Sequence, residues 1–243
     1  MRSLDQRLST IAAMVAIALE AEPTSDRLPQ ARKVLADVGS DHGYLLASLL
    51  RSGVVRRGIA IEKNPTPLER SRKTLRALDA DVRLADGLDG LAPDEADCLA
   101  ISGMGGELIA QILERNPHVI PDRVVLQPNC HEEVVRRWMY HHQFAIFDEQ
   151  WVYDKNAYTI IGFRRIPSGR DASYEGLDHE LAIRFGPKLL KRRDPEWLDW
   201  VSTELERLQS YPKLNFSSQA YLEQLNQIVA SSFDTNEPIV KID

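Results

Sequence analysis

The sequence is poor in residues that define several classes of protein. It contains two cysteines in 243 residues, Cys98 and Cys130, which is too few for a disulfide framework or a cysteine-based zinc site. Both stand beside apolar, strand-like segments, so we expect buried structural thiols. None of the six histidines has the spacing of a metal-binding motif, and the sequence therefore predicts no metal site.

Long apolar runs and an excess of positive charge are missing as well. No segment approaches the roughly 20 apolar residues that span a bilayer, and residues 1–20 are typical of an amphipathic helix rather than a signal peptide. We therefore expect a cytoplasmic protein with no membrane partner, and nothing indicates an obligate protein partner. The 30 basic and 36 acidic residues give a net charge of −6, which by itself argues against binding to nucleic acid.

Positive charge is nevertheless concentrated in places. Three clusters stand out: Arg70, Arg72, Lys73 and Arg76; Arg136 and Arg137; and Lys188, Lys191, Arg192 and Arg193. The simplest interpretation of each cluster is a solvated helix face. The alternative is a surface that contacts a polyanion.

Strand-like and helix-like segments alternate from residue 34 to about residue 142. The predicted strands are 34–38, 57–61, 81–84, 98–101 and 123–126, and a predicted β-hairpin over 144–153 and 157–164 follows them. This order favours an α/β fold with a Rossmann-like, mainly parallel sheet and an antiparallel edge strand. We assign residues 1–166 to this domain.

The remaining residues, 167–243, are predicted to form a helical domain. Two runs have coiled-coil spacing: Leu198, Val201, Leu205 and Leu208, then Leu222, Leu225 and Val229. Pro212 lies between them, so an antiparallel two-helix hairpin fits.

The segment Asp37–Tyr44 is the most informative part of the chain. An apolar strand ends at Asp37, and Gly39 and Gly43 then bracket Ser40, Asp41 and His42. Nucleotide-like ligands bind at this place in open α/β folds. Asp41, however, occupies the position of the middle glycine of the dinucleotide fingerprint, where a carboxylate would repel a pyrophosphate. A cationic ligand such as S-adenosylmethionine fits better, and a nicotinamide dehydrogenase is the weakest alternative.

Further polar and glycine residues follow the other predicted strands. Glu62, followed by Lys63, is placed to bind ribose hydroxyls, and Asp86-Gly87 to bind an adenine amine. The glycine-rich segment Ser102–Gly106 lets a ligand approach the backbone. The predicted cofactor-binding residues are Asp37, Gly39, Ser40, His42, Gly43, Glu62, Lys63, Asp86, Gly87, Ser102, Gly103, Met104, Gly105 and Gly106.

The segment Gln127-Pro128-Asn129 ends the fifth predicted strand. Its amides could read the edge of a base. Alternatively, Asn129 caps the helix that begins near Glu132.

Three motifs together resemble one family. Asp37–Leu45, the Gly-Met-Gly-Gly of residues 103–106 and Leu126–Asn129 are similar to motifs of the bacterial tRNA adenosine N1-methyltransferases that act on adenosine 22. The resemblance covers nearly the whole chain. It implies a Rossmann-like class I methyltransferase domain with a C-terminal coiled-coil domain, S-adenosyl-L-methionine as cofactor and tRNA as partner.

Within that resemblance, roles can be suggested for individual residues. N1-methylation makes adenine cationic, and Asp41 could stabilise that charge or take the proton. Its alternative role is to bind the cationic end of the cofactor. Asn129 could hold the base together with Gln127 and Pro128, and tRNA docking is expected at Arg72, Arg76, Lys191 and Arg192. A methyltransferase with another substrate and a non-catalytic cofactor- or tRNA-binding module remain alternatives.

Overall fold

The chain divides into two compact units. The computed structural model describes residues 4–20 and 33–230, and the division separates Met1–Asp171 (unit 1) from Ala172–Asp243 (unit 2). The buried Asp171 carboxylate, at the end of unit 1, accepts a hydrogen bond from the Ile146 amide at 2.8 Å. This bond fastens the segment that follows the last strand to unit 1.

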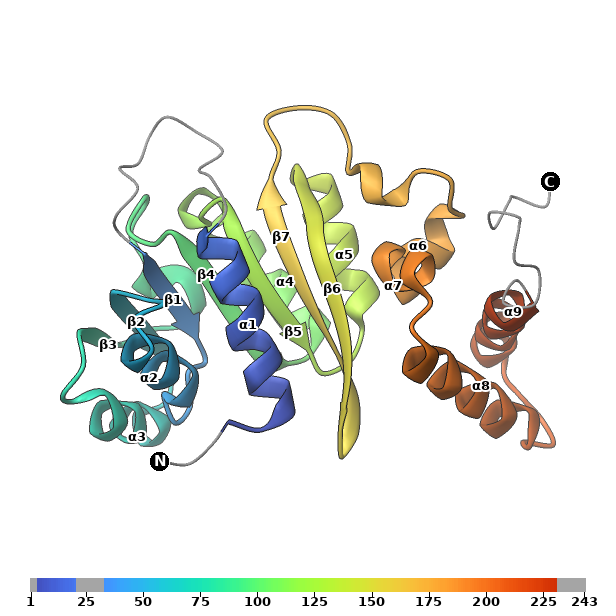
Figure 1. Ribbon diagram of the computed structural model, residues 1–243, viewed down its shortest axis with the longest axis horizontal. Helices are drawn as coiled ribbons and strands as arrows, with labels where there is room; N and C mark the ends of the chain where they lie inside the picture. Colours follow the sequence, from blue (N-terminus) through green and yellow to red (C-terminus); the bar gives the residue numbers. More distant parts are fainter. Residues whose placement is uncertain (1–3, 21–32, 231–243) are drawn as a thin grey trace. The chain divides into compact units, whose positions relative to one another are not determined.

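A mixed sheet of seven strands forms the centre of the described part of unit 1 (Figure 1). The strands are β1 (Val34–Val38), β2 (Arg57–Glu62), β3 (Ala80–Leu84), β4 (Cys98–Met104), β5 (Arg123–Pro128), β6 (Phe144–Asp154) and β7 (Asn156–Arg165). Their spatial order is β3-β2-β1-β4-β5-β7-β6. The strands β1 to β5 are parallel, and β7 runs antiparallel to both of its neighbours. The predicted α/β fold is confirmed, with the antiparallel strand second from the edge.

The strand order contains one topological switch point. From β1 the chain moves outward to β2 and β3, and it then returns to place β4 on the other side of β1. The carboxyl ends of β1 and β4 therefore diverge into helices on different sides of the sheet. Ligands of open α/β sheets bind in the crevice at such a point.

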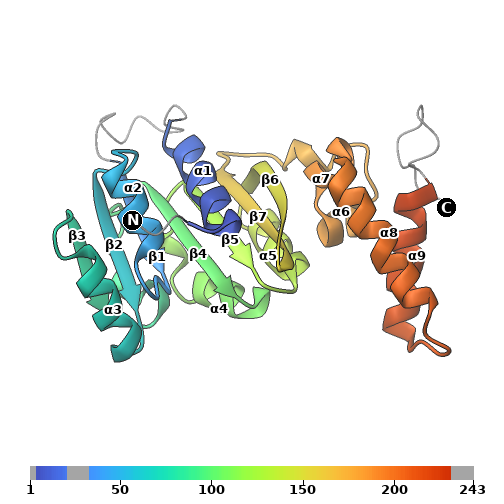
Figure 2. The same cartoon turned by 60° about the horizontal axis from the view of Figure 1, so that its bottom comes forward.

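Two groups of helices cover the sheet. On one face, α1 (Gln6–Glu20) packs against α2 (Tyr44–Arg51), which packs against α3 (Pro65–Leu75). On the other face, α4 (Gly106–Arg115) packs against α5 (Glu132–His141) (Figure 2). A short 3₁₀ turn, η1 (Gly87–Gly90), contacts α4 and β2.

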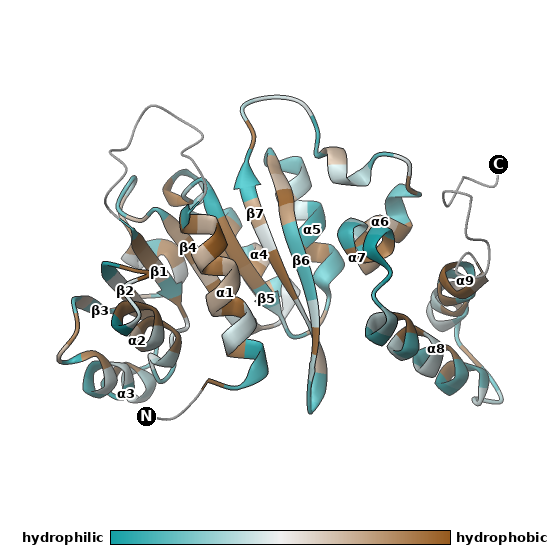
Figure 3. Cartoon of the chain, viewed as in Figure 1, coloured by the Kyte–Doolittle hydropathy of each residue, from teal (hydrophilic) through white to brown (hydrophobic). Residues whose placement is uncertain are grey.

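The predicted N-terminal amphipathic helix is α1. The Asp5 side chain accepts a hydrogen bond from the Leu8 amide at 2.8 Å and so caps the helix start. Ile11, Met14, Val15 and Ala18 recur at helical spacing and are buried. They pack toward β5, β6 and β7, and Figure 3 shows the apolar colouring of α1 beside that of β4. This packing fixes the first turn of α1 near the carboxyl ends of the strands.

Two strands run further than the sequence patterns predict. β4 continues through Ser102 to Met104, and β5 continues through Gln127 to Pro128. The two extensions pair with each other, Ser102 with Gln127 and Met104 with Pro128, across a register irregularity. Both motifs therefore begin as strand and only then become loop.

Two expectations about individual residues are corrected. Cys98 is buried, and burial raises the pKa of its thiol to about 12, but Cys130 is exposed because it follows the end of β5. Arg136 is 1% exposed and pairs with the buried Glu149 at 2.8 Å. It therefore does not belong to a solvated helix face.

Unit 2 is helical over its described residues. It contains η3 (Ala172–Tyr174), α6 (His179–Phe185), α7 (Pro187–Arg192), α8 (Pro195–Gln209) and α9 (Phe216–Ala230). α8 packs against α9, and Phe185 of α6 stacks on Tyr221 of α9. The residues buried on α8 and α9 are Trp197, Val201, Leu205, Leu208, Leu225 and Ile228. Trp197 and Ile228 thus replace Leu198 and Val229 of the expected coiled-coil pattern, and a coiled coil is not confirmed.

Candidate functional site

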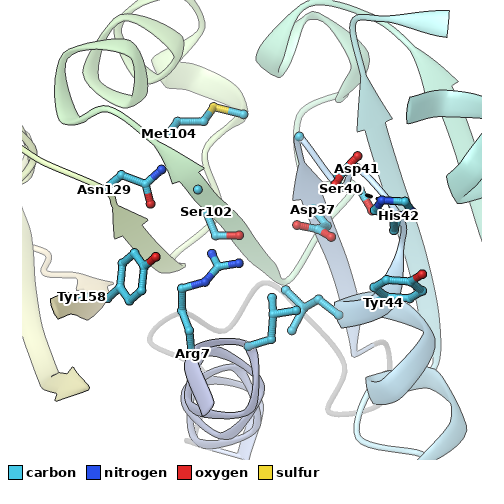
Figure 4. Close-up of a pocket in the computed structure, with 14 residues that line it drawn as sticks. Arg7, Asp37, Ser40, Asp41, His42, Tyr44, Ser102, Met104, Asn129 and Tyr158 are labelled. Carbon is cyan, nitrogen blue, oxygen red and sulfur yellow. Dashed lines mark ion pairs between the residues drawn. The ribbon is translucent and has the colours of Figure 1, made fainter. Parts of the chain in front are cut away.

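A cavity of about 430 Å³ opens at the switch point of the sheet (Figure 4). Its walls come from the first turn of α1, the end of β1 with the loop that follows, the start of α2 and the end of β4. The residue that follows β5 and a residue within β7 complete the walls. The lining residues are Arg7, Leu8, Asp37, Gly39, Ser40, Asp41, His42, Tyr44, Leu45, Ser102, Gly103, Met104, Asn129 and Tyr158. All of them belong to unit 1.

The structure brings many of the predicted site residues to this cavity. Those in its lining are Asp37, Gly39, Ser40, Asp41, His42, Ser102, Gly103, Met104 and Asn129. Those outside the lining are Gly43, Glu62, Lys63, Asp86, Gly87, Gly105, Gly106, Gln127 and Pro128. The predicted docking residues Arg72 and Arg76 are exposed at the end of α3, and Lys191 and Arg192 are exposed on α7 of unit 2.

The loop between β1 and α2 is a tight turn. Gly39 has φ +73°, a left-handed conformation that glycine adopts without strain. Its amide donates to the Ile61 carbonyl at 2.9 Å, and the Gly43 amide donates to the Ser40 carbonyl at 2.8 Å. The turn exposes the backbone of residues 39–42 toward the cavity.

A buried carboxyl group lies below this turn. Asp37 is 2% exposed, and desolvation raises its pKa from 3.8 to about 7, opposed by the neighbouring Ser40 hydroxyl and aided slightly by the Glu62 carboxylate. Burial also raises the pKa of Glu62, whose carboxylate accepts a hydrogen bond from the Asp41 amide. Two buried acids therefore lie at the carboxyl ends of β1 and β2, and Asp37 lines the cavity.

A hydroxyl group lies beside the Asp37 carboxyl group. The buried Ser40 hydroxyl is close enough to Asp37 to lower the pKa of its carboxyl, against the effect of burial. The two side chains give a donor and acceptor set that suits S-adenosylmethionine, which carries an ammonium group and ribose hydroxyls.

Asp41 lies at the rim of the cavity. Its side chain is 61% exposed, with His42 Nε2 at 3.6 Å and Arg70 Nη1 at 3.8 Å. The backbone of Asp41 is in the left-handed region at φ +48° and is held by Ser71, whose hydroxyl donates to the Asp41 carbonyl at 2.8 Å. Its carboxylate is thus accessible to a large substrate.

Asp86 lies outside the cavity, on the surface. Its carboxylate contacts Arg115 at 3.1 Å and Lys63 at 3.7 Å, and the hydrogen bond from Arg115 contributes most to lowering its pKa. Lys63 is therefore a partner of Asp86 here.

Gln127 connects three walls of the site. It is fully buried, and its Oε1 accepts from Arg7 at 2.6 Å and from the Gly103 amide at 3.1 Å. Its Nε2 donates to Asn129 Oδ1 at 3.0 Å. The alternative in which Asn129 caps α5 is wrong, because His131 occupies the cap position and no side chain caps that end. The bond from Gln127 leaves the Asn129 amide group at the cavity.

The cavity residues that were not among the predicted site residues are Arg7, Leu8, Tyr44, Leu45 and Tyr158. The Arg7 guanidinium lies 5.5 Å from the centre of the Tyr158 ring. Arg7 was visible as a charge interrupting an amphipathic helix, but only tertiary packing brings α1 to the strand ends. Tyr158 gave no signal, because it alternates normally within a strand.

A second group of polar side chains lies at the start of α4. Glu107, Cys130 and His131 are exposed and place ligand-type atoms within 4.8 Å of one another. Close packing positions them, since a Cβ added at Gly106 would stand 2.1 Å from the His131 carbonyl oxygen. Glu107 is remote in sequence from the other two, so spacing alone could not reveal the group.

Comparisons with known proteins show the family of the chain. Residues 35–233 match the model of the TrmK family, tRNA (adenine(22)-N(1))-methyltransferase. The chain is 31% identical over 216 residues to the tRNA (adenine(22)-N(1))-methyltransferase of Bacillus subtilis, covering 86% of this chain and 90% of that protein.

Solved structures show the same relationship. The crystal structure of the B. subtilis m1A22 tRNA methyltransferase TrmK has a TM-score of 0.78 at 27% identity, covering 93% of this chain and 99% of that one. Streptococcus pneumoniae Sp1610 in complex with S-adenosyl-L-methionine has a TM-score of 0.76 at 28% identity, covering 93% and 100%. The chain belongs to the TrmK family of tRNA (adenine(22)-N(1))-methyltransferases.

Proposed function

We propose that this protein transfers a methyl group from S-adenosyl-L-methionine to N1 of adenosine 22 in tRNA, in the cytoplasm. Family membership identifies the reaction class. The observation that carries the proposal is the cavity at the switch point, which places the buried carboxyl of Asp37 beside the hydroxyl of Ser40. No helix in the described part of the chain is long and apolar enough to cross a membrane.

The cofactor would be held by residues of the β1, β2 and β4 ends. Asp37 pairs with its ammonium group, Glu62 accepts from the ribose hydroxyls, and the backbone of Ser102 to Met104 covers its amino-acid part. Asp86 and Gly87 bind the adenine, which requires Asp86 to exchange Arg115 or Lys63 for the exocyclic amine. When bound, S-adenosylmethionine supplies an activated methyl group on a sulfonium.

The residues around Asn129 would position the target base. Alignment of N1 with the methyl group is the main catalytic requirement, and the adenine must leave its stack to reach the cavity. The Asn129 side chain, oriented by Gln127, contacts the edge of the base. The Tyr158 ring offers a stacking surface on the adjacent wall.

Asp41 is the proposed group for the developing charge. The methylated adenine is cationic until a proton leaves its amine, and a carboxylate at the rim stabilises that charge. The competing role, binding of the cationic end of the cofactor, is better suited to Asp37, because Asp37 is buried and Asp41 is exposed.

The tRNA would be docked by the exposed basic residues. Arg72 and Arg76 on α3 and Lys191 and Arg192 on α7 are exposed, although Arg72 pairs with Glu69 and Arg192 with Asp194, each at 2.6 Å. These pairs lie at the surface and are weak enough to exchange for phosphates.

The direct test is to incubate the protein with labelled cofactor and unmodified tRNA and to map the modified nucleotide. We expect N1-methyladenosine at position 22 and no label in a transcript in which that adenosine is replaced by guanosine. Label in protein, or at another nucleotide, would identify a different methyltransferase of the same fold. Binding of cofactor and tRNA without any transfer would identify a non-catalytic module.

A further inference from the structure

Glu107, Cys130 and His131 form a group of side chains of the types that bind metals, outside the cofactor cavity. A carboxylate oxygen, the Cys130 Sγ and an imidazole nitrogen all lie within 4.8 Å of one another. Nδ1 of His131 contacts Oε1 of Glu107, and none of the three residues lines the cavity. All three side chains are exposed, so an ion can reach them from solvent.

Backbone hydrogen bonds hold together the two segments that carry these residues. The Asn129 amide donates to the Met104 carbonyl at 2.7 Å, and the Gly106 amide donates to the Cys130 carbonyl at 2.9 Å. His131 has φ +58°, which turns the chain into α5 immediately after Cys130. The backbone that presents the three ligand atoms is therefore fixed without an ion, and binding orders only side chains.

The separation of the ligand atoms suits a small ion with tetrahedral coordination. Zn²⁺ binds sulfur at about 2.3 Å and nitrogen or oxygen at about 2.0–2.2 Å. These bond lengths place the ligand atoms of a tetrahedral site roughly 3.5 Å apart. Atoms within 4.8 Å of one another reach that separation by rotation of exposed side chains. Three protein ligands leave the fourth position to a water molecule.

The kinds of ligand atom indicate which metal the group accepts. Thiolate and imidazole favour Zn²⁺ and neighbouring transition metals, whereas Mg²⁺ and Ca²⁺ prefer oxygen ligands. Binding releases the thiol proton of Cys130 to solvent. The resulting thiolate and the Glu107 carboxylate then balance the two positive charges of Zn²⁺, and the neutral imidazole of His131 adds a ligand without adding charge.

We propose that Glu107, Cys130 and His131 bind one Zn²⁺ ion. The ion clamps the start of α4 to the segment between β5 and α5. Both segments continue into walls of the cavity, since Met104 and Asn129 belong to its lining. The metal site therefore lies beside the cavity without forming part of it. The proposal goes beyond the proposed function and is independent of it, because metal binding can be measured without cofactor or RNA.

The test is Zn²⁺ binding by the full chain under reducing conditions, measured by competition with a chromogenic chelator. Wild-type protein should bind one ion per chain. Glu107→Gln, Cys130→Ser and His131→Asn should each weaken binding at least about tenfold, because the loss of a residue that merely supports a ligand already has such an effect. Asparagine is the choice at residue 131 because it tolerates the left-handed backbone. Circular dichroism checks the fold of each variant, and if one variant is unfolded the other two decide.

Cobalt identifies the ligands spectroscopically. Co²⁺ occupies zinc sites and gives a charge-transfer band in the near ultraviolet when a thiolate is bound. Wild-type protein should show this band and Cys130→Ser should lack it. The chain has one other cysteine, the buried Cys98, so the band reports on Cys130. His118→Asn makes the same change at an exposed histidine outside the group, and it should leave both the band and the Zn²⁺ affinity unchanged.

The remaining outcomes overturn the proposal. If wild-type protein takes no Zn²⁺ from the chelator, Glu107 and His131 form only a surface ion pair. If the three variants bind Zn²⁺ as wild type does, or if His118→Asn weakens binding as much as they do, the ion binds elsewhere. If one ion binds per two chains and gel filtration shows a dimer, the ion joins two copies and the site within one chain is wrong. None of these outcomes affects the proposed methyl transfer.

Discussion

Asp37 shows at the scale of one residue how a binding site costs stability. Its pKa in the folded protein, about 7, lies above the ordinary value of 3.8 because burial disfavours the charged form. The folded state is therefore more stable when the Asp37 carboxyl is protonated than when it is charged. This contribution is complete below pH 3.8 and is lost as the pH rises through about 7.

The first prediction concerns this pH dependence. In the free protein, the free energy of unfolding of Asp37→Asn should rise relative to wild type between about pH 4 and about pH 7 and stay constant above that, since the amide remains neutral. Cofactor affinity should behave oppositely: in wild type it increases over this range, by up to about tenfold per pH unit below the pKa, and in Asp37→Asn the increase is absent.

Urea denaturation and calorimetry at several pH values measure the two quantities. Asp79→Asn, the same change at an exposed position, should follow wild type in both. Equal pH profiles for Asp37→Asn and wild type would show that Asp37 does not titrate in this range.

The second prediction concerns Asp41. Because its carboxylate lies at the rim and is exposed, Asp41→Asn should reduce kcat by roughly 100-fold or more, as for the loss of a general base. The dissociation constant for S-adenosylmethionine should change by less than about threefold. Single-turnover methylation and calorimetry separate these effects. A normal kcat would contradict the catalytic role, and a large loss of affinity with normal kcat would assign Asp41 to the cofactor.

At the scale of secondary-structure elements, the walls of the cavity depend on how α5 and β6 are joined. The Arg136–Glu149 pair connects them and is 1% and 0% exposed. α5 follows the Asn129 segment, and β6 pairs with β7, which carries Tyr158. The buried pair thus supports two elements that shape the proposed base-binding wall.

The third prediction is a double-mutant cycle on this pair. Arg136→Met or Glu149→Leu alone should lower the free energy of unfolding by about 3–5 kcal/mol, because each removes one charge of a buried ion pair. The double variant should be much less destabilised than the sum of the two. Arg137→Met changes the neighbouring exposed arginine and should cost less than about 1 kcal/mol. Additive single effects would show that the two charges do not interact.

The elements also show what sequence patterns could and could not reveal. Local signals were sufficient for the strands and for the Asp37–Gly43 turn. The alternation of strand-like and helix-like segments, the glycines and the acids at strand ends can each be read from a few neighbouring residues. The positions of Arg7 and Tyr158 depend on α1 packing on β5 to β7, which is a long-range event. Arg136 was misread for the same reason: its partner Glu149 lies on another element.

At the scale of the whole molecule, the protein must bind a polyanion although its own net charge is −6. Binding to RNA then depends on where basic residues gather, rather than on their total. The two proposed docking clusters lie on different units, α3 on unit 1 and α7 on unit 2. The cofactor cavity lies entirely in unit 1, so cofactor binding and tRNA binding should be separable by substitution.

The fourth prediction uses this separation in the full-length protein. Two double charge reversals, Arg72→Glu with Arg76→Glu and Lys191→Glu with Arg192→Glu, should each raise the KM for tRNA at least tenfold. Each should leave the affinity for S-adenosylmethionine unchanged. The slope of log K against log salt concentration should become shallower by a little less than about 1 for every phosphate that the variant no longer neutralises. Arg56→Glu with Arg57→Glu is the matched control, because both arginines are exposed at the start of β2, away from the carboxyl ends of the strands. If the control weakens tRNA binding as much as the test variants do, charge acts through the overall field of the protein. If only the α3 pair has an effect, Lys191 and Arg192 of α7 do not dock the RNA.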